Sequence, residues 1–334
     1  MTDPVLVEML RGNVVESVHR GAAVVMDASG KVVLALGDTA RPVFPRSAVK
    51  AIQALPLVET GAADAYGFGH AELALACASH SGEPRHAELA AAMLAKAGLD
   101  ETALECGAHW PTSQSATVAL ARTGAEPSAL HNNCSGKHSG FLCTCCHEGL
   151  DRHGYVGAAH PFQDMVRQAM QEVTGAEHSE ANRGTDGCSI PTYAVPLDSL
   201  ALGFARMVTG QGFGPERAKA ARRLLEACMA EPFLVAGTDR ADTRLMDMAP
   251  GRIFVKVGAE GVYCAALPEL GLGIALKCDD GAGRAAEVAI SAILQKLFSK
   301  DGELVSKLSD VSNPQMTNWN GIHVGSLRPS AALA

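Results

Sequence analysis

Strand-like patterns lie at both ends of this chain and helical patterns fill its middle, and this distribution constrains the fold more than any other feature. The terminal patterns are runs of β-branched or alternating apolar residues, separated by glycines or by turn signals such as DASGK. They occupy residues 5–11, 14–27, 31–38, 251–258, 261–269 and 271–280. We expect the strands from the two ends to join in one antiparallel sheet.

The helical patterns are rich in Ala, Leu, Glu and Lys. The clearest one, residues 84–100, has Pro84 near its start and Gly98 near its end, which are typical helix-boundary residues. Further helical patterns cover residues 136–148, 161–173, 197–209, 215–229 and 283–298.

Together these patterns predict a mixed α+β fold in a single composite domain that spans residues 1–334. Residues from about 1 to 40 and from about 250 to 334 would form the sheet, and the residues between them would form a helical lobe. The tail after Ser309 has no regular pattern apart from a final strand at residues 321–327.

The distribution of charge favours small molecules as ligands. The net charge is −8 and there is no run of Lys and Arg, which argues against a nucleic acid or an anionic membrane as partner. Gly, Pro or charged residues interrupt every apolar stretch well short of the roughly 20 residues that a membrane span needs. The first residues lack a basic segment followed by an apolar core, so we expect no signal peptide and a cytoplasmic location.

Ser47 and Lys50 form a Ser-x-x-Lys motif where an apolar helical pattern begins, in the segment VFPRSAVKAIQALPLVETGAA. Residues three apart share one face of a helix, and a lysine that burial keeps neutral can take the proton of a serine hydroxyl. The motif therefore fits a nucleophile and its base. It also fits a serine helix cap beside a solvated lysine, because the motif is short enough to occur by chance.

A second lysine, Lys256, occurs as Lys-x-Gly within a predicted strand. Penicillin-recognising serine enzymes combine Ser-x-x-Lys, a serine-containing turn and a Lys-Thr/Ser-Gly strand in this order. Here the turn element is ASHSGE, with Ser79 and Ser81. It differs from Ser-Asp-Asn, and Val257 replaces the hydroxyl residue, which argues against β-lactam chemistry. A charge on an edge strand is the alternative explanation for Lys256.

Two glycine-containing segments, HNNCSGKHSGF and GTDGCSIPT, carry Cys134 and Cys188. Backbone N–H groups before a helix can hold a carboxylate or an oxyanion. The two cysteines could form a disulfide, bind a metal together or stay apart. Their spacing matches no Cys-x-x-Cys zinc pattern, and most of the ten cysteines of a cytoplasmic chain are expected to be buried free thiols.

Five segments together resemble the class 3, rhizobial-type L-asparaginases, also called the asparaginase II family. They are PRSAVKAIQALPLVETGA, LALACASHSGEPRH, HNNCSGKHSGFL, GTDGCSIPTYAVPL and VKVGAEGVYCAALP. The resemblance runs in order from about Val5 to Arg328, which is nearly the whole chain. Each segment is longer and more specific than Ser-x-x-Lys alone.

The resemblance implies hydrolysis of L-asparagine to L-aspartate and ammonia, and a fold similar to serine β-lactamases and glutaminases. It also implies two adjacent Ser–Lys tandems, Ser47 with Lys50 and Ser79 with Lys256. Ser47 would attack the side-chain amide, with Lys50 as general base and later proton donor to ammonia. Ser79 and Lys256 would relay protons or help activate the water that hydrolyses the acyl-enzyme. Which of the two serines attacks stays open at this point.

The resemblance further implies one zinc ion per chain, bound by Cys134, Lys137 and Cys188, completed by water, with a role in orienting the substrate. Asp186 would lie behind these ligands or receive the substrate ammonium group. The predicted substrate-binding residues are Arg46, His80, Cys134, Gly136 and Asp186. A homodimer is expected by analogy with the family.

Three alternatives stay open. A glutaminase of similar fold differs in a substrate with one extra methylene, which is worth only about 1–3 kcal/mol of discrimination. A penicillin-recognising serine hydrolase is disfavoured by the altered turn and strand motifs. A non-catalytic protein could bind zinc or an amino acid through Cys134, Lys137 and Cys188, but such a protein has no need of two Ser–Lys pairs.

Overall fold

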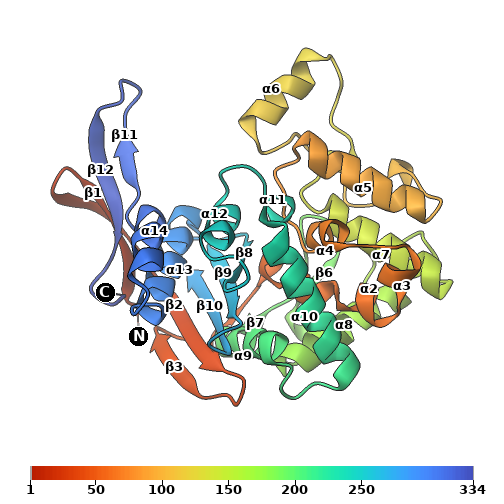
Figure 1. Cartoon of the computed structure of the whole chain (residues 1–334), viewed down its shortest axis with the longest axis horizontal. Helices are drawn as coiled ribbons and strands as arrows, with labels where there is room; N and C mark the ends of the chain where they lie inside the picture. Colours follow the sequence, from red (N-terminus) through yellow and green to blue (C-terminus); the bar gives the residue numbers. More distant parts are fainter. Residues whose placement is uncertain (1, 334) are drawn as a thin grey trace.

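An eight-stranded antiparallel sheet and the helices packed around and beside it make up the molecule (Figure 1). The computed structural model describes residues 2–333. The strands of the sheet are β1 (Val5–Arg11), β2 (Val14–Asp27), β3 (Val32–Leu36), β8 (Phe254–Gly258), β9 (Val262–Leu267), β10 (Leu272–Cys278), β11 (Gln315–Thr317) and β12 (His323–Pro329). Their order is β11-β12-β1-β2-β10-β9-β8, and β3 pairs with β2. The predicted α+β fold, with an antiparallel sheet drawn from both chain ends, is confirmed.

The long strand β2 connects two parts of the sheet. Its residues 14–20 pair with β1, and its residues 21–27 pair with β10. The change of partner occurs at Gly21, where a Cβ atom would lie 2.1 Å from the backbone oxygen of Lys277. A side chain would therefore keep the two strands apart at this point. The part made of β1, β12 and β11 projects from the body as an arm, whereas the other part lies next to the helices (Figure 1).

Helices fill the middle of the chain, and one pair follows the last central strand. They are α1 (Lys50–Gln53), α2 (Leu55–Glu59), α3 (Ala62–Ala65), α4 (His70–Ala76), α5 (Pro84–Lys96), α6 (Gln114–Arg122), α7 (Ser135–Glu148), α8 (Pro161–Thr174), α9 (Leu197–Thr209), α10 (Pro215–Ala230), α11 (Pro232–Val235), α12 (Ala241–Met248), α13 (Gly283–Leu297) and α14 (Gly302–Ser312). All six residues of β9 are buried, so both faces of the sheet are covered there. Helix α9 packs against β2, β9 and β10, and α13 packs against β1, β9, β10 and β12.

Short elements complete the lobe. The 3₁₀ helices are η1 (Arg46–Val49), η2 (Glu101–Ala103), η3 (Ala129–His131) and η4 (Glu180–Asn182). Two small strand pairs join β4 (Pro42–Val43) to β7 (Val195–Pro196) and β5 (Arg183–Thr185) to β6 (Pro191–Tyr193).

The apolar run after Ser47 differs from the single helix that its pattern suggests. It forms η1, α1 and α2 in succession, with a break at Ala54. Pro56 is responsible, because it has no N–H to donate to the carbonyl of Ile52 four residues earlier. In the tail, α14 extends past Ser309 and β12 begins two residues after the predicted start of the final strand.

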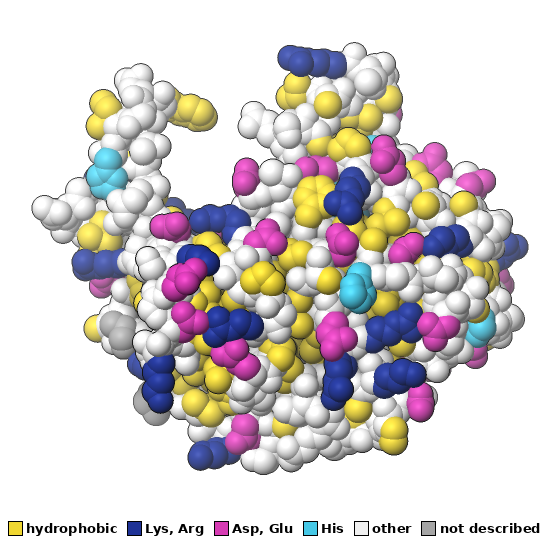
Figure 2. Space-filling view, viewed as in Figure 1, with side chains coloured by type: hydrophobic (Ala, Val, Ile, Leu, Met, Phe, Trp, Pro, Cys, Tyr) yellow, Lys and Arg dark blue, Asp and Glu magenta, His cyan; other side chains and the backbone are white. Residues whose placement is uncertain are grey.

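The surface gives little direct information about partners. No helix within residues 2–333 is both long and apolar enough to cross a membrane. On the face drawn in Figure 2, Lys and Arg side chains are interspersed with Asp and Glu side chains. The more informative region is the β8 edge of the sheet, where β8 packs against η1 and α12 of the helical lobe.

Candidate active site

A cavity of about 270 Å³ opens where β8 meets the helical lobe. Its lining residues are Arg46, Ser47, Ser79, His109, Asn132, Asn133, Cys134, Asp186, Gly187, Cys188, Arg240, Val257, Gly258 and Ala259. The predicted lysines Lys50, Lys137 and Lys256 lie behind this lining, with exposed fractions of 0%, 1% and 0%. Lysine is almost never fully buried without a specific partner, so three such lysines around one cavity point to a functional site.

Ser47 and Lys50 lie one above the other on a tight helical turn. Residues 46–49 form η1, and the N–H of Lys50 donates to the carbonyl oxygen of Ser47. Side chains three residues apart are eclipsed in a 3₁₀ helix, which aligns them more closely than an α-helix does. The N-cap position of η1 is Pro45, and no side chain caps the helix. The interpretation of Ser47 as a helix cap is therefore wrong.

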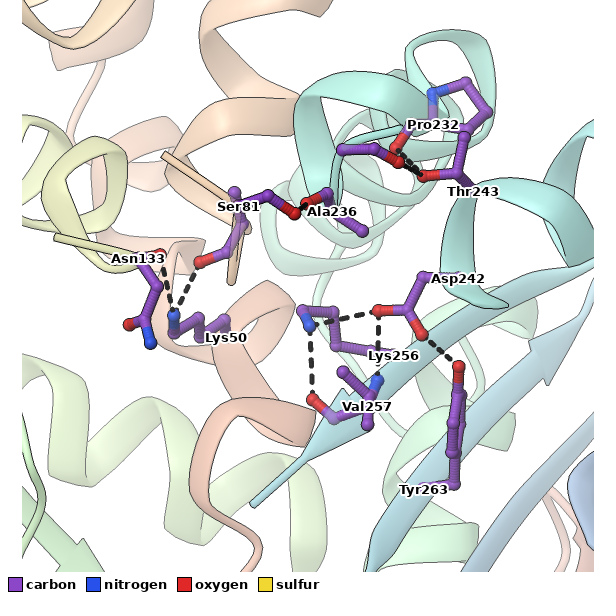
Figure 3. Close-up of polar contacts among 12 residues, drawn as sticks. Lys50, Ser81, Asn133, Pro232, Ala236, Asp242, Thr243, Lys256, Val257 and Tyr263 are labelled. Carbon is purple, nitrogen blue, oxygen red and sulfur yellow. Dashed lines mark hydrogen bonds and ion pairs between the residues drawn. The ribbon is translucent and has the colours of Figure 1, made fainter. Parts of the chain in front are cut away.

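The Lys50 ammonium is held inside the protein by groups of the cavity wall. Its Nζ donates to the carbonyl oxygen of Ala78 at 2.5 Å and lies 3.1 Å from Sγ of Cys134. A longer contact of 3.5 Å reaches the carbonyl oxygen of Asn133 (Figure 3). The interpretation of Lys50 as a solvated lysine is therefore also wrong. Because Ala78 directly precedes Ser79, the ammonium group lies beside the segments of both predicted serines.

Lys256 points inward from β8 and is held by a buried carboxylate (Figure 3). Its Nζ lies 3.2 Å from Oδ2 of Asp242 and donates to the carbonyl oxygen of Val257 at 3.1 Å. Asp242 also accepts hydrogen bonds from the backbone N–H of Val257, at 3.2 Å, and from the hydroxyl of Tyr263. The carboxylate therefore joins β8, β9 and α12 at the lysine.

Burial lowers the pKa of Lys256 below its ordinary value of 10.5. The Asp242 charge opposes this effect, whereas the nearby positive charge of Lys50 adds to it. A lowered pKa makes the neutral amine more accessible, which is what a general base needs.

No hydrogen bond joins Ser47 to Lys50, or Ser79 to Lys256, within residues 2–333. Catalytic hydrogen bonds are often long without substrate and tighten only when it binds. Ser79 is positioned by its backbone, since its N–H donates to the carbonyl oxygen of Val235 at 3.0 Å. The structure brings both serines to one cavity, and their pairing with the two lysines stays a prediction.

Cys134, Cys188 and Lys137 converge at the cavity wall. Nζ of Lys137 lies 3.1 Å from Sγ of Cys188. A hydrogen bond from Cys188, together with the charges of Lys50 and Lys137, lowers the pKa of Cys134 well below 9.0 in spite of burial. The same bond, with burial, raises the pKa of Cys188. Burial opposes the charge on Lys137, but the neighbouring sulfur atoms outweigh it and raise the pKa of the ammonium group.

This donor set fits zinc. Thiolates are preferred zinc ligands, and a site with three protein ligands leaves a position for water or substrate. Binding would require Lys137 and Cys188 to lose their protons, as metal binding normally does for such ligands. Within residues 2–333 no group of three or more His, Cys, Asp and Glu side chains is placed to hold a metal ion. Lys137 would therefore have to serve as the third protein ligand.

Arg46 and Asp186 form an ion pair in the cavity wall, with 2.6 Å between Nε and Oδ1. Arg46 has a φ of +52°, in the left-handed region that residues other than glycine seldom adopt. Burial acts to raise the pKa of Asp186, but the charges of Lys137 and Arg46 outweigh it, so the pKa is lowered. The carboxylate is therefore charged, and its Oδ2 has no hydrogen bond within residues 2–333.

Two predicted substrate-binding residues, His80 and Gly136, are not among the cavity-lining residues of the described chain. The His80 Nδ1 atom accepts the N–H of Gly82 at 3.1 Å, which leaves Nε2 to donate to Oγ of Ser135 at 2.9 Å. At Gly136, a Cβ atom would lie 2.4 Å from the backbone oxygen of Leu75. Both residues therefore support the packing of the wall, and their contact with substrate stays a prediction.

The site also contains polar residues that no sequence motif had indicated. They are Arg240, His109, Asn132 and Asn133 in the lining, and Asp242 and Tyr263 behind it. Asp242 lies 14 residues before Lys256, on a different element, so no local motif joins the two. Asn132 and Asn133 lie within the HNNCSGKHSGF segment and Tyr263 within VKVGAEGVYCAALP, and these segments were the signal that could have found them.

With the geometry established, comparison with known proteins decides the family. A family model described as L-asparaginase II matches residues 7–329. The chain belongs to the asparaginase II family. This confirms the resemblance seen in the five sequence segments.

The other comparisons add little about this asparaginase II family member. The search of curated proteins gives no match. A solved structure of Mglu in its native form in 4.3 M NaCl has 17% identity and a TM-score of 0.37, and covers 84% of this chain and 61% of that chain. A β-lactamase (Mb2281c) from Mycobacterium bovis has 15% identity and a TM-score of 0.34, and covers 83% of this chain and 94% of that one. The chain thus spans less than two thirds of the Mglu chain. At these TM-scores neither similarity supports an inference about function.

Proposed function

We propose that this protein hydrolyses L-asparagine to L-aspartate and ammonia through a serine acyl-enzyme. The observation that carries the proposal is that Ser47 and Ser79 share one cavity, with the fully buried lysines Lys50 and Lys256 directly behind it. Family membership favours asparagine as the substrate.

In the first half of the reaction, Oγ of Ser47 attacks the carbonyl carbon of the side-chain amide. Lys50 takes the hydroxyl proton and then gives it to the amide nitrogen, so the C–N bond breaks and ammonia leaves. The eclipsed 3₁₀ turn supports this assignment, because it aligns the two side chains on one edge. The product of this half is an ester on Ser47.

In the second half, water attacks the ester carbon and Lys256 takes a proton of this water through Ser79. The C–O bond to Ser47 then breaks, the proton passes to Oγ of Ser47, and aspartate leaves. The lowered pKa of Lys256 supports this role, and Asp242 keeps the amine oriented. The free Oδ2 of Asp186 supports its predicted role as acceptor for the substrate ammonium group. Cys134, Lys137 and Cys188 would hold the zinc ion, which when bound supplies a positive charge that orients the substrate.

The test is ammonia release from L-asparagine and, separately, from L-glutamine by the purified protein and its variants. We expect release from asparagine, with kcat at least about 1,000-fold lower in Ser47→Ala. Ser79→Ala should lose the deacylation step more than the first step, which a pre-steady-state burst of ammonia would reveal. Ser306→Ala, on the exposed face of α14, is the matched control and should keep full activity.

Near-full activity of Ser47→Ala would refute the nucleophile assignment. Release from glutamine at a rate similar to asparagine would favour a glutaminase. Failure of the folded, zinc-loaded protein to release ammonia from either amide would favour a binding protein. The homodimer and the cytoplasmic location stay predictions, and light scattering after size-exclusion chromatography tests the first of them.

A further inference from the structure

Arg240 lines the cavity, and its side chain has no partner among the residues that the structure describes. It is half-buried, and it precedes helix α12 as the N-cap residue. Within residues 2–333 its guanidinium makes no hydrogen bond and no ion pair. Its positive charge acts to lower the pKa values of Lys256, Tyr263 and Glu287, but within residues 2–333 none of these groups pairs with it. An arginine in a cavity with its donors unused is arranged for a ligand.

The other arginine of the cavity is in a different situation. Arg46 is already engaged, because its Nε donates to Asp186 at 2.6 Å. The three buried lysines behind the lining are also occupied by carbonyl oxygens, sulfur atoms or Asp242. Among the arginines and lysines of this site within residues 2–333, Arg240 is therefore the one whose charged group is available to a negatively charged ligand.

The loop that carries Arg240 is held firmly against the turn that carries Ser79. The N–H and the hydroxyl of Thr238 donate to the two carboxylate oxygens of Glu83, at 2.8 Å and 2.7 Å. Ser81 donates to the carbonyl oxygen of Ala236 at 2.9 Å. At Gly237, which has a φ of +119°, a Cβ atom would lie 2.6 Å from Oγ of Ser81. These contacts keep Arg240 in a constant position relative to the serine.

We propose that Arg240 binds the α-carboxylate of the amino-acid substrate. It is then the main reason why the enzyme requires a substrate with an α-carboxylate. The inference rests on the proposed function and assigns to Arg240 the recognition of one group of the proposed substrate. A guanidinium presents two parallel N–H donors that match a carboxylate. The free Oδ2 of Asp186 complements it, because an amino acid carries one group of each charge. The described part of the chain thus offers a guanidinium and a carboxylate oxygen without partners in one cavity, which fits such a zwitterion.

The experiment compares two substrates that differ only in the α-carboxylate. L-asparagine carries it, whereas 3-aminopropionamide has the same amide and amine but lacks it. We expect Arg240→Gln to lower kcat/KM for asparagine by about 10- to 100-fold, as for a lost hydrogen bond to a charged group. The value for 3-aminopropionamide should stay within about 2-fold. Arg240→Lys should be intermediate, because it keeps the charge but loses the paired donors.

Arg244→Gln is the matched control, since Arg244 lies one turn further along α12, exposed and outside the cavity lining. It should leave both substrates unaffected. If turnover of 3-aminopropionamide is too slow to measure, inhibition constants for L-aspartate and β-alanine provide the same comparison. If Arg240→Gln lowers kcat/KM equally for asparagine and 3-aminopropionamide, or weakens inhibition by L-aspartate and β-alanine equally, the proposal is overturned. A shifted pH profile of activity would then show that Arg240 acts through Lys256.

A failure of the proposed function is distinguishable from a failure of this inference. If the wild-type protein releases no ammonia from asparagine, the hydrolase assignment is wrong. Titration calorimetry with L-aspartate and β-alanine then tests Arg240 alone. Weaker binding of L-aspartate by Arg240→Gln, with β-alanine unchanged, would support the carboxylate site, and unchanged binding of both would overturn it.

Discussion

Replacing Asp242 by Asn tests how the buried network controls Lys256. The substitution keeps the shape of the side chain and removes its charge. Lys256 and Asp242 are 0% and 1% exposed, and their charged atoms are 3.2 Å apart. Coulomb's law with an effective dielectric constant of about 20 gives an attraction of about 5 kcal/mol at this distance. Losing all of that attraction would lower the pKa of Lys256 by just under 4 units. Relaxation of the protein and entry of water reduce the effect, so we expect the pKa of Lys256 to fall by about 1–3 units in the variant.

The sign of the effect on activity follows from this shift. Lys256 must be neutral to accept a proton, and a lower pKa leaves it neutral at lower pH. Lys256 acts in the second half of the reaction, so the readout is kcat where hydrolysis of the ester limits the rate. The acid limb of that kcat profile for asparagine should therefore move to lower pH in Asp242→Asn by at least about 1 unit. Asp247→Asn is the matched control, because Asp247 is an exposed carboxylate on the same helix.

Stability provides a readout that does not depend on catalysis. The pKa of Lys256 is below 10.5 in the folded protein, so between the folded value and 10.5 the unfolded chain binds more protons and stability rises with pH. In Asp242→Asn the buried ammonium loses its counter-charge, which should cost about 3–5 kcal/mol at low pH. The deficit should shrink as the pH rises towards 10.5, when Lys256 is neutral in both proteins. An unchanged acid limb together with a pH-independent loss of stability would refute the electrostatic reasoning.

Two further predictions concern packing and metal binding. Gly136→Ala places a Cβ atom 2.4 Å from the backbone oxygen of Leu75, so it should lower the unfolding free energy by about 1–3 kcal/mol. Gly140→Ala on the same helix, with its closest contact at 3.2 Å, should have a much smaller effect in the same denaturant titration. Cys134→Ala should reduce bound zinc, measured by elemental analysis, and raise KM more than it lowers kcat, whereas Cys264→Ala in β9 should keep its metal. Zinc content unaffected by Cys134→Ala would show that the ligand set is wrong.

The sequence by itself determined the longer strands and helices and part of the cavity lining. Helix α9 occupies the predicted residues 197–209, and β1, β2, β3, β8, β9 and β10 lie within the predicted strand ranges, whereas β11 was not predicted. Side-chain periodicity is local, so it can be recognised without knowledge of the fold. The position of Ser47 relative to Lys50 is local in the same sense, because three residues of any helix bring them to one side.

Only the tertiary structure decided which interpretation of these motifs holds. The Ser-x-x-Lys motif is the same whether Lys50 is solvated or buried. Lys50 is buried because its side chain packs against the segments that carry Ala78 and Cys134. The partnership of Lys256 with Asp242 depends on β8 lying beside α12. The free guanidinium of Arg240 depends on a loop held by Glu83, more than 150 residues earlier in the chain. Burial, charge pairing and cavity access are properties of the whole packed chain, and local spacing cannot specify them.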